Sequence, residues 1–193
     1  MIQKRYKDST KLFLLFKDEI YPNFLMWKFI MSKKPVELNV SPIIHMFLVG
    51  NSINMLLLKL ASLFDKNNNA LSIYYFFKKE KISKNKKEDI KSILSRYKDL
   101  ISRILAIRGN LIGHHNEKFF YDIENVELNR AFNFTFIEME LFMEDCKKIV
   151  EIIQDDTSYQ LNDYKKEDYK KIFLKDVEEE MQDFFNSLII NKY

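Results

Sequence analysis

The 193-residue sequence contains 47% hydrophobic and 31% charged residues. This length and composition suit one soluble domain with a well-packed core. Only three glycines and three prolines are present, which is too few for the turns that a sheet protein of this size needs. The composition therefore excludes a mainly β fold and predicts an all-α protein.

The single cysteine, Cys146, excludes a disulfide framework within the chain, and we expect its side chain to be a small buried hydrophobe. The N-terminal residues lack the long apolar run of a signal peptide. The most apolar stretch, residues 54–64, is interrupted by Lys59 and is too short to cross a bilayer. We therefore expect a protein of the reducing cytoplasm with no membrane partner.

The net charge of +3 is unevenly distributed along the chain. Residues 78–98 contain nine Lys or Arg and three acidic residues, whereas residues 151–193 contain six Lys and eleven acidic residues. Such a basic block is typical of a surface that binds a polyanion, although a solvated loop and helix face has the same composition. The candidate RNA-binding residues are Lys84, Lys86, Lys87 and Lys91.

Apolar residues spaced by three and four positions predict the helices. The first spans about residues 4–31, and Pro22 should kink or interrupt it because proline lacks the backbone N–H. The second begins at Pro42, which suits the first helical position, after Ser41 as N-cap, and it ends near Phe64.

Four more helices follow in the predicted order. A short helix over residues 70–77 leads into a lysine-rich connection, and a longer one spans about residues 87–110. Another runs from residue 126 or 128 to 153, and the last spans about residues 161–190, where an interruption near Phe173 is left open. Because the sequence contains no internal repeat and no low-complexity linker, we predict one domain over residues 1–193.

Two of the three glycines and two of the three histidines lie within residues 109–115, at the end of a strongly periodic helix. Glycine is less favourable than alanine inside a helix by roughly 1 kcal/mol, so this composition predicts a helix end, a kink or a close backbone approach. In one ideal helix, Arg108 and His114 would lie roughly 120° apart. They can converge on a ligand if the helix ends between them or if a twofold axis supplies the same pair from a second subunit.

An arginine, four to six further residues and a histidine resemble the signature of the HEPN superfamily. Arg108 and His114 enclose five residues, and His115 also satisfies the pattern. In addition, Leu-Ala-Ser-Leu-Phe-Asp at residues 60–65 followed by Ala-Leu-Ser-Ile at residues 70–73 is similar to an element of the abortive-infection HEPN proteins of the Abi-U type. The resemblance covers about residues 40–155.

The resemblance implies an antiparallel helical bundle with extra N- and C-terminal helices, and a homodimer in which two arginines and two histidines share one cleft. It further implies a metal-independent endoribonuclease that acts as a toxin or phage-defence effector, without a cofactor and with an antitoxin or operon partner among its possible partners. Arg108 would bind phosphate and His114 would serve as base or acid. Supporting roles would fall to Asn110, His115 and Asn116.

Two positions depart from the family pattern. Gly109 stands where Asn, Asp or His usually follows the arginine, and Asn116 stands where an acidic residue is frequent. These departures keep open a non-catalytic helical module that binds a partner protein, a nucleotide or RNA. We expect His45 to cap a helix or pack in the core, and we expect no zinc site because no carboxylate stands at helix spacing from the histidine pair.

Overall fold

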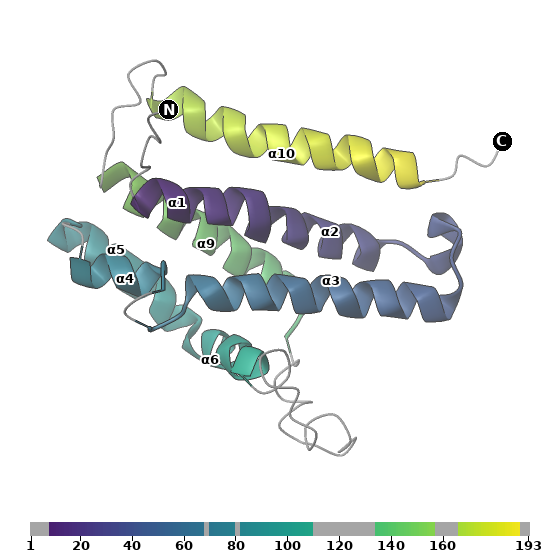
Figure 1. Cartoon of the computed structure of the whole chain (residues 1–193), viewed down its shortest axis with the longest axis horizontal. Coiled ribbons are helices and arrows are strands. Elements are labelled where there is room, and N and C mark those ends of the chain that lie inside the picture. The colour runs from purple at the N-terminus through teal and green to yellow at the C-terminus, as the bar shows by residue number, and fades with distance from the viewer. Residues whose placement is uncertain (1–7, 68–69, 80–81, 110–133, 157–165, 190–193) are drawn as a thin grey trace, which may run out of the picture. The chain divides into compact units, whose positions relative to one another are not determined.

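The computed structural model describes residues 8–67, 70–79, 82–109, 134–156 and 166–189, and every regular element in these ranges is helical (Figure 1). The all-α prediction is therefore confirmed. The chain divides into two compact units, residues 1–16 with 57–158 and residues 17–56 with 159–193. The expectation of one domain over residues 1–193 stays a prediction.

The first predicted helix is interrupted, as expected, just before Pro22. Helix α1 (Asp8–Leu15) passes through a π-helical turn (Phe16–Ile20) into α2 (Tyr21–Ser32). Pro22 has no N–H to donate to the preceding turn, which disturbs the regular hydrogen-bond ladder there. A short 3₁₀ turn (Pro35–Leu38) then leads toward the next helix.

Helix α3 (Pro42–Leu63) begins where its sequence predicts. The N–H of Ile44 donates to Ser41 Oγ at 3.3 Å, so Ser41 satisfies one of the free donors of the first turn. Its early apolar residues are exposed: Ile43 is 80% and Met46 73% exposed. By length and composition alone, α3 is the one helix within the described ranges that could cross a membrane, a property shared by the core helices of soluble proteins. The absence of a membrane partner therefore stays a prediction.

The expected helix over residues 87–110 is wrong in detail, because two helices occupy this region. Helix α4 (Ile73–Lys79) is followed by α5 (Lys84–Arg96) and α6 (Lys98–Ile107), with Tyr97 between them at φ −111° and ψ 18°. Both Arg96 Nη2 and Tyr97 Oη donate to Asp145 Oδ2, at 3.0 and 2.9 Å. Neighbouring residues of a straight helix point about 100° apart, so the break lets both side chains reach one carboxylate.

Helix α9 (Phe136–Asp156) starts later than predicted. Residues 134 and 135 are not helical, and the earlier expected start at residue 126 or 128 lies outside the described residues. Thr135 Oγ1 accepts the Glu138 N–H at 3.0 Å, while Glu138 Oε2 accepts the Thr135 N–H at 3.4 Å. This reciprocal cap fixes the start of the helix. Helix α10 (Lys166–Leu188) continues through Phe173 without interruption.

The first unit packs its helices around α9. Helices α1 and α5 both contact α9, as Figure 1 shows. The Phe142 ring of α9 lies 5.5 Å from the Phe64 ring and 4.9 Å from the Tyr97 ring, measured between centroids. Cys146 is buried, as predicted, and burial raises the pKa of its thiol well above the ordinary value. Other fully buried side chains of this unit include Leu12, Phe13, Leu57, Leu60, Leu63, Ile73 and Phe76.

The second unit is built on the contact between α2 and α10. The rings of Phe29 and Phe185 stack with centroids 4.1 Å apart, and Ile30 completes this small core. The Tyr21 hydroxyl donates to Glu178, which adds a polar contact between the same two helices. The acidic C-terminal region therefore contributes a structural helix to this unit.

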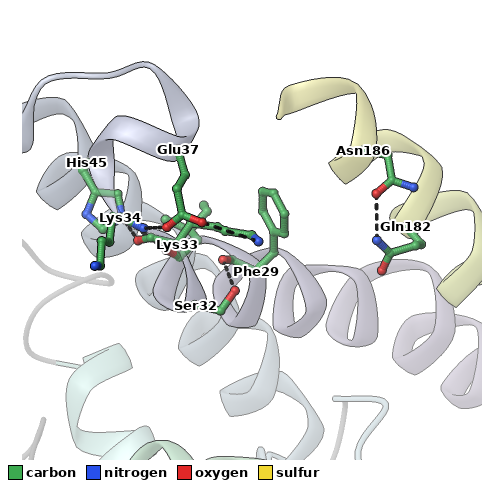
Figure 2. A network of polar contacts seen from close by, with 9 residues as sticks. Phe29, Ser32, Lys33, Lys34, Glu37, His45, Gln182 and Asn186 are labelled. Carbon is green, nitrogen blue, oxygen red and sulfur yellow. Dashed lines mark hydrogen bonds and ion pairs between the residues drawn. The ribbon is translucent and has the colours of Figure 1, made fainter. Parts of the chain in front are cut away.

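His45 caps the end of α2. Its Nε2 lies 2.9 Å from the Lys33 carbonyl oxygen and 3.2 Å from that of Ile30 (Figure 2). Carbonyl oxygens only accept, so Nε2 carries the proton and donates to both. These carbonyls are among the groups that the end of a helix leaves without an internal partner. The expectation that His45 is a capping residue is confirmed.

Candidate functional site around Arg108 and Asp65

Arg108 follows directly on α6 and still has a helical backbone, with φ −57° and ψ −47°. Its N–H donates to the carbonyl oxygens of Ile104 and Leu105, which fixes the residue to the last helical turn. Ile104 and Ile107 are fully buried, whereas the Arg108 side chain is 34% exposed. The helix therefore anchors Arg108 at the edge of the core while its guanidinium remains accessible.

The guanidinium of Arg108 binds the carboxylate of Asp65. Nη1 donates to Oδ2 at 2.6 Å, and the Asp65 side chain is 22% exposed. Asp65 comes just after the end of α3, so this ion pair joins the ends of two helices of the first unit. A charge-assisted hydrogen bond of this length restricts the position of the arginine more strongly than a neutral contact would.

Asp65 is itself held by the residues that follow it. Its Oδ1 accepts the Asn67 N–H at 2.8 Å, and its carbonyl oxygen accepts the Ser72 hydroxyl at 2.5 Å. Ser72 is fully buried, and its Oγ accepts the Tyr75 N–H at 3.4 Å in the first turn of α4. The loop between α3 and α4 thus fixes both the backbone and the carboxylate that contacts Arg108.

These contacts keep the Asp65 carboxylate charged. Hydrogen bonding from the Asn67 backbone and then from Arg108 holds the pKa of Asp65 below its ordinary value, against a smaller opposing effect of burial. A carboxylate with a lowered pKa accepts a proton poorly near neutral pH. The chemistry available to Asp65 is therefore electrostatic: it can orient a cation, but it is a poor general base.

Three of the expected RNA-binding lysines, Lys84, Lys86 and Lys87, lie in the first turn of α5, and Lys91 lies about two turns beyond Lys84. Lys84 and Lys91 are exposed, whereas Lys86 and Lys87 are partly buried, and Lys91 Nζ pairs with Glu88 at 2.8 Å. The first turn of α5 contains no acidic residue. Cations at a helix N-terminus oppose the helix dipole, so helix stability does not account for the placement of Lys84, Lys86 and Lys87 in the first turn.

A second polar cluster surrounds Asp145 of α9. Its carboxylate is 9% exposed and accepts hydrogen bonds from Arg96, Tyr97 and Lys148. Burial acts to raise the pKa of Asp145, but the hydrogen bonds from Lys148 and Tyr97 and the nearby positive charges outweigh it and lower the pKa. Burial and the bond to Asp145 raise the pKa of Tyr97 to about 12. This cluster fixes the α5–α6 bend on α9.

The other residues of the predicted motif cannot be placed beside Arg108, because Asn110, His114, His115 and Asn116 lie outside the described residues. Gly109 is described: its φ is not positive, and a Cβ added there would meet no atom within 4 Å. The close backbone approach that the glycine suggested is therefore not seen at this position. No group of three His, Cys, Asp or Glu suited to a metal occurs in the part of the chain that the structure describes.

Asp65 is the site residue that the sequence analysis missed. It stands in the Leu-Phe-Asp segment that the resemblance had already singled out, but no role was assigned to it there. Arg108 and Asp65 are 43 positions apart, so no local spacing links them. The signal was the presence of a carboxylate and a serine in one family-like element, and the contact itself needed the fold.

A HEPN family model described as AbiU2 matches residues 20–173. The match is wider than the expected residues 40–155, since it begins in the turn before α2 and ends within α10. It contains both Asp65 and Arg108. No curated protein and no solved structure matches the chain. Because the family model covers most of the sequence, the chain belongs to the AbiU2 family of abortive-infection HEPN proteins.

Proposed function

We propose that this protein is an endoribonuclease of phage defence or toxin systems, and that its active site combines Arg108 and His114 from the two subunits of a homodimer. The observation that carries the proposal is the position of Arg108. Its guanidinium is anchored by the end of α6, paired with Asp65 and accessible, within the residues that the family model matches.

The reaction follows from the residue types. The 2′-hydroxyl oxygen of RNA attacks the adjacent phosphorus and the bond to the 5′-oxygen breaks, which leaves a 2′,3′-cyclic phosphate and a 5′-hydroxyl. One His114 imidazole takes the proton from the 2′-hydroxyl, and the partner subunit's His114 donates a proton to the departing 5′-oxygen. Histidine suits both roles because its ordinary pKa is about 6.5.

Arg108 would stabilise the charge that develops on the phosphorane. A guanidinium stays protonated throughout the physiological pH range and matches two phosphate oxygens with parallel hydrogen bonds. The lysines of α5 support an RNA substrate, because they provide cations for the phosphate backbone, and Lys84, Lys86 and Lys87 lie at a helix end where they oppose the dipole.

Cleavage of total bacterial RNA by the wild type and by His114→Ala tests the proposal. We expect the wild type to produce 5′-hydroxyl ends, and the variant to be slower by about 10²- to 10⁴-fold while its circular dichroism is unchanged. His45→Gln is a matched control, because His45 caps α2 and its replacement retains an N–H donor.

Two results would contradict the proposal. If the wild type leaves all RNAs intact, the chain is a binding module without this activity. If sedimentation shows a monomer at concentrations at which the protein cleaves RNA, the active site is not shared between subunits.

A further inference from the structure

We infer that Asp65 is a positioning residue, which holds Arg108 by one nitrogen and turns the opposite edge of the guanidinium toward the scissile phosphate. This inference rests on the proposed function. It adds a residue from the α3–α4 loop to a site whose predicted catalytic and supporting residues all lie within residues 108–116.

The first argument is the edge that Asp65 uses. The ion pair joins Nη1 of Arg108 to Oδ2 of Asp65. No other hydrogen bond joins Nε or Nη2 of Arg108 to a residue in the described ranges. These two nitrogens form the second edge of the planar guanidinium, and together they match two oxygens of one phosphate. The arginine can thus bind both anions at once.

The second argument is the rigidity of the carboxylate. One oxygen of Asp65 is occupied by the Asn67 N–H, and its carbonyl oxygen is occupied by the buried Ser72 hydroxyl. Only Oδ2 is directed at Arg108. A carboxylate that is fixed in this way restricts the orientation of the Arg108 side chain, which otherwise samples many rotamers.

The third argument is the accessibility of the pair. Arg108 is 34% and Asp65 22% exposed, so the guanidinium is neither fully enclosed nor fully hydrated. If Asp65 instead acted as a competing counter-ion, its removal would free Arg108 and speed up cleavage. The use of a single nitrogen favours positioning, because a competitor gains most from the bidentate edge, which Asp65 leaves unoccupied.

The test compares Asp65→Ala, Asp65→Asn and Arg108→Ala in the full-length chain, with a short single-stranded RNA as substrate. Asp99→Asn is the matched control: Asp99 pairs with Arg103 at 2.9 Å on the same helix α6, and its side chain is 87% exposed. Thermal unfolding is measured for each variant, so that loss of folding is recognised separately.

We expect Asp65→Ala to lower kcat by about 10- to 100-fold and to raise KM by a smaller factor, since a misdirected arginine loses some affinity for the bound phosphate and loses most in the transition state. Asp65→Asn keeps one oxygen, which can accept from Arg108 only if the amide NH2 faces the Asn67 N–H, so this variant should recover a part of kcat but not all of it. The dependence of kcat on pH should have the same shape in the Asp65 variants as in the wild type, because the histidines are unchanged. Asp99→Asn should behave as the wild type.

Binding of the same RNA in a His114→Ala background separates this inference from the proposed function. Here Asp65→Ala and Arg108→Ala should each weaken binding, and the double variant should bind no more weakly than Arg108→Ala alone. Additive losses would overturn the positioning role, as would undiminished or faster cleavage by a folded Asp65 variant. If Arg108→Ala affects neither cleavage nor binding, the proposed function fails as well. If Asp65→Ala does not fold, the same comparisons with Asp65→Asn decide the question.

Discussion

Arg108 at the end of α6 and Asp65 after the end of α3 form a 2.6 Å ion pair across 43 positions of sequence. Each residue belongs to one of the two sequence elements that resemble the abortive-infection HEPN proteins. The fold therefore joins these elements through a direct contact between their charged side chains. This contact gives the Leu-Phe-Asp segment a physical role, which is to present a fixed carboxylate to the motif arginine.

The lysines of α5 should make binding of RNA sensitive to salt. Each phosphate contact on a single strand contributes about 0.7 to the slope of log affinity against log salt concentration. Replacement of Lys84, Lys87 and Lys91 by Gln should therefore reduce the slope by about 2. The slope is measured by titrating a single-stranded RNA with the His114→Ala protein, with and without the three lysine replacements, at several salt concentrations. Lys175→Gln on α10, an exposed lysine paired with Glu179, is the control. An unchanged slope in the triple variant would show that α5 does not contact the RNA.

Gly109 should tolerate a side chain. Its φ is not positive and open space surrounds the position of a Cβ, so Gly109→Ala should leave the free energy of unfolding unchanged or raise it by up to about 1 kcal/mol. Gly109→Asn, which restores a residue usual in the family, should fold equally well. Urea unfolding measures both. A loss of stability above about 1 kcal/mol in the alanine variant would show that the backbone needs glycine here.

Asp145 should stabilise the first unit in a manner that depends on pH. Its pKa is lowered in the folded state, so its contribution is present above the unfolded pKa of about 3.9 and is lost as the pH falls through the folded value. Asp145→Asn should lower the free energy of unfolding by about 1–3 kcal/mol at pH 7, because it removes charge-assisted hydrogen bonds.

Denaturant unfolding at pH 7 and at pH 3 tests this linkage. The stability difference between the wild type and Asp145→Asn should shrink at the lower pH, where the wild-type carboxyl is increasingly protonated. Asp99→Asn removes an exposed carboxylate and should change stability by less than about 0.5 kcal/mol at pH 7. A difference that stays constant with pH would mean that another group accounts for the effect of Asp145.

Local signals determined most helix positions. The Ser41-Pro42 start of α3 and the interruption before Pro22 were both predictable, because they depend on the chemistry of adjacent residues. The break at Tyr97 was not, since the carboxylate that Tyr97 contacts there lies 48 positions away on α9. Periodicity alone cannot detect such a break, because both helices continue the same apolar spacing.

The sequence by itself determined that this chain is helical and that it resembles the HEPN family, and it predicted a site at Arg108 and the histidines after it. These conclusions depend on composition and on residues close together in the chain. Only the tertiary structure decided that Asp65 pairs with Arg108 and that Arg96 and Tyr97, at the α5–α6 break, share the carboxylate of Asp145. The physical reason is that an ion pair requires a few ångströms in space, and packing of helices, not spacing in sequence, sets that distance.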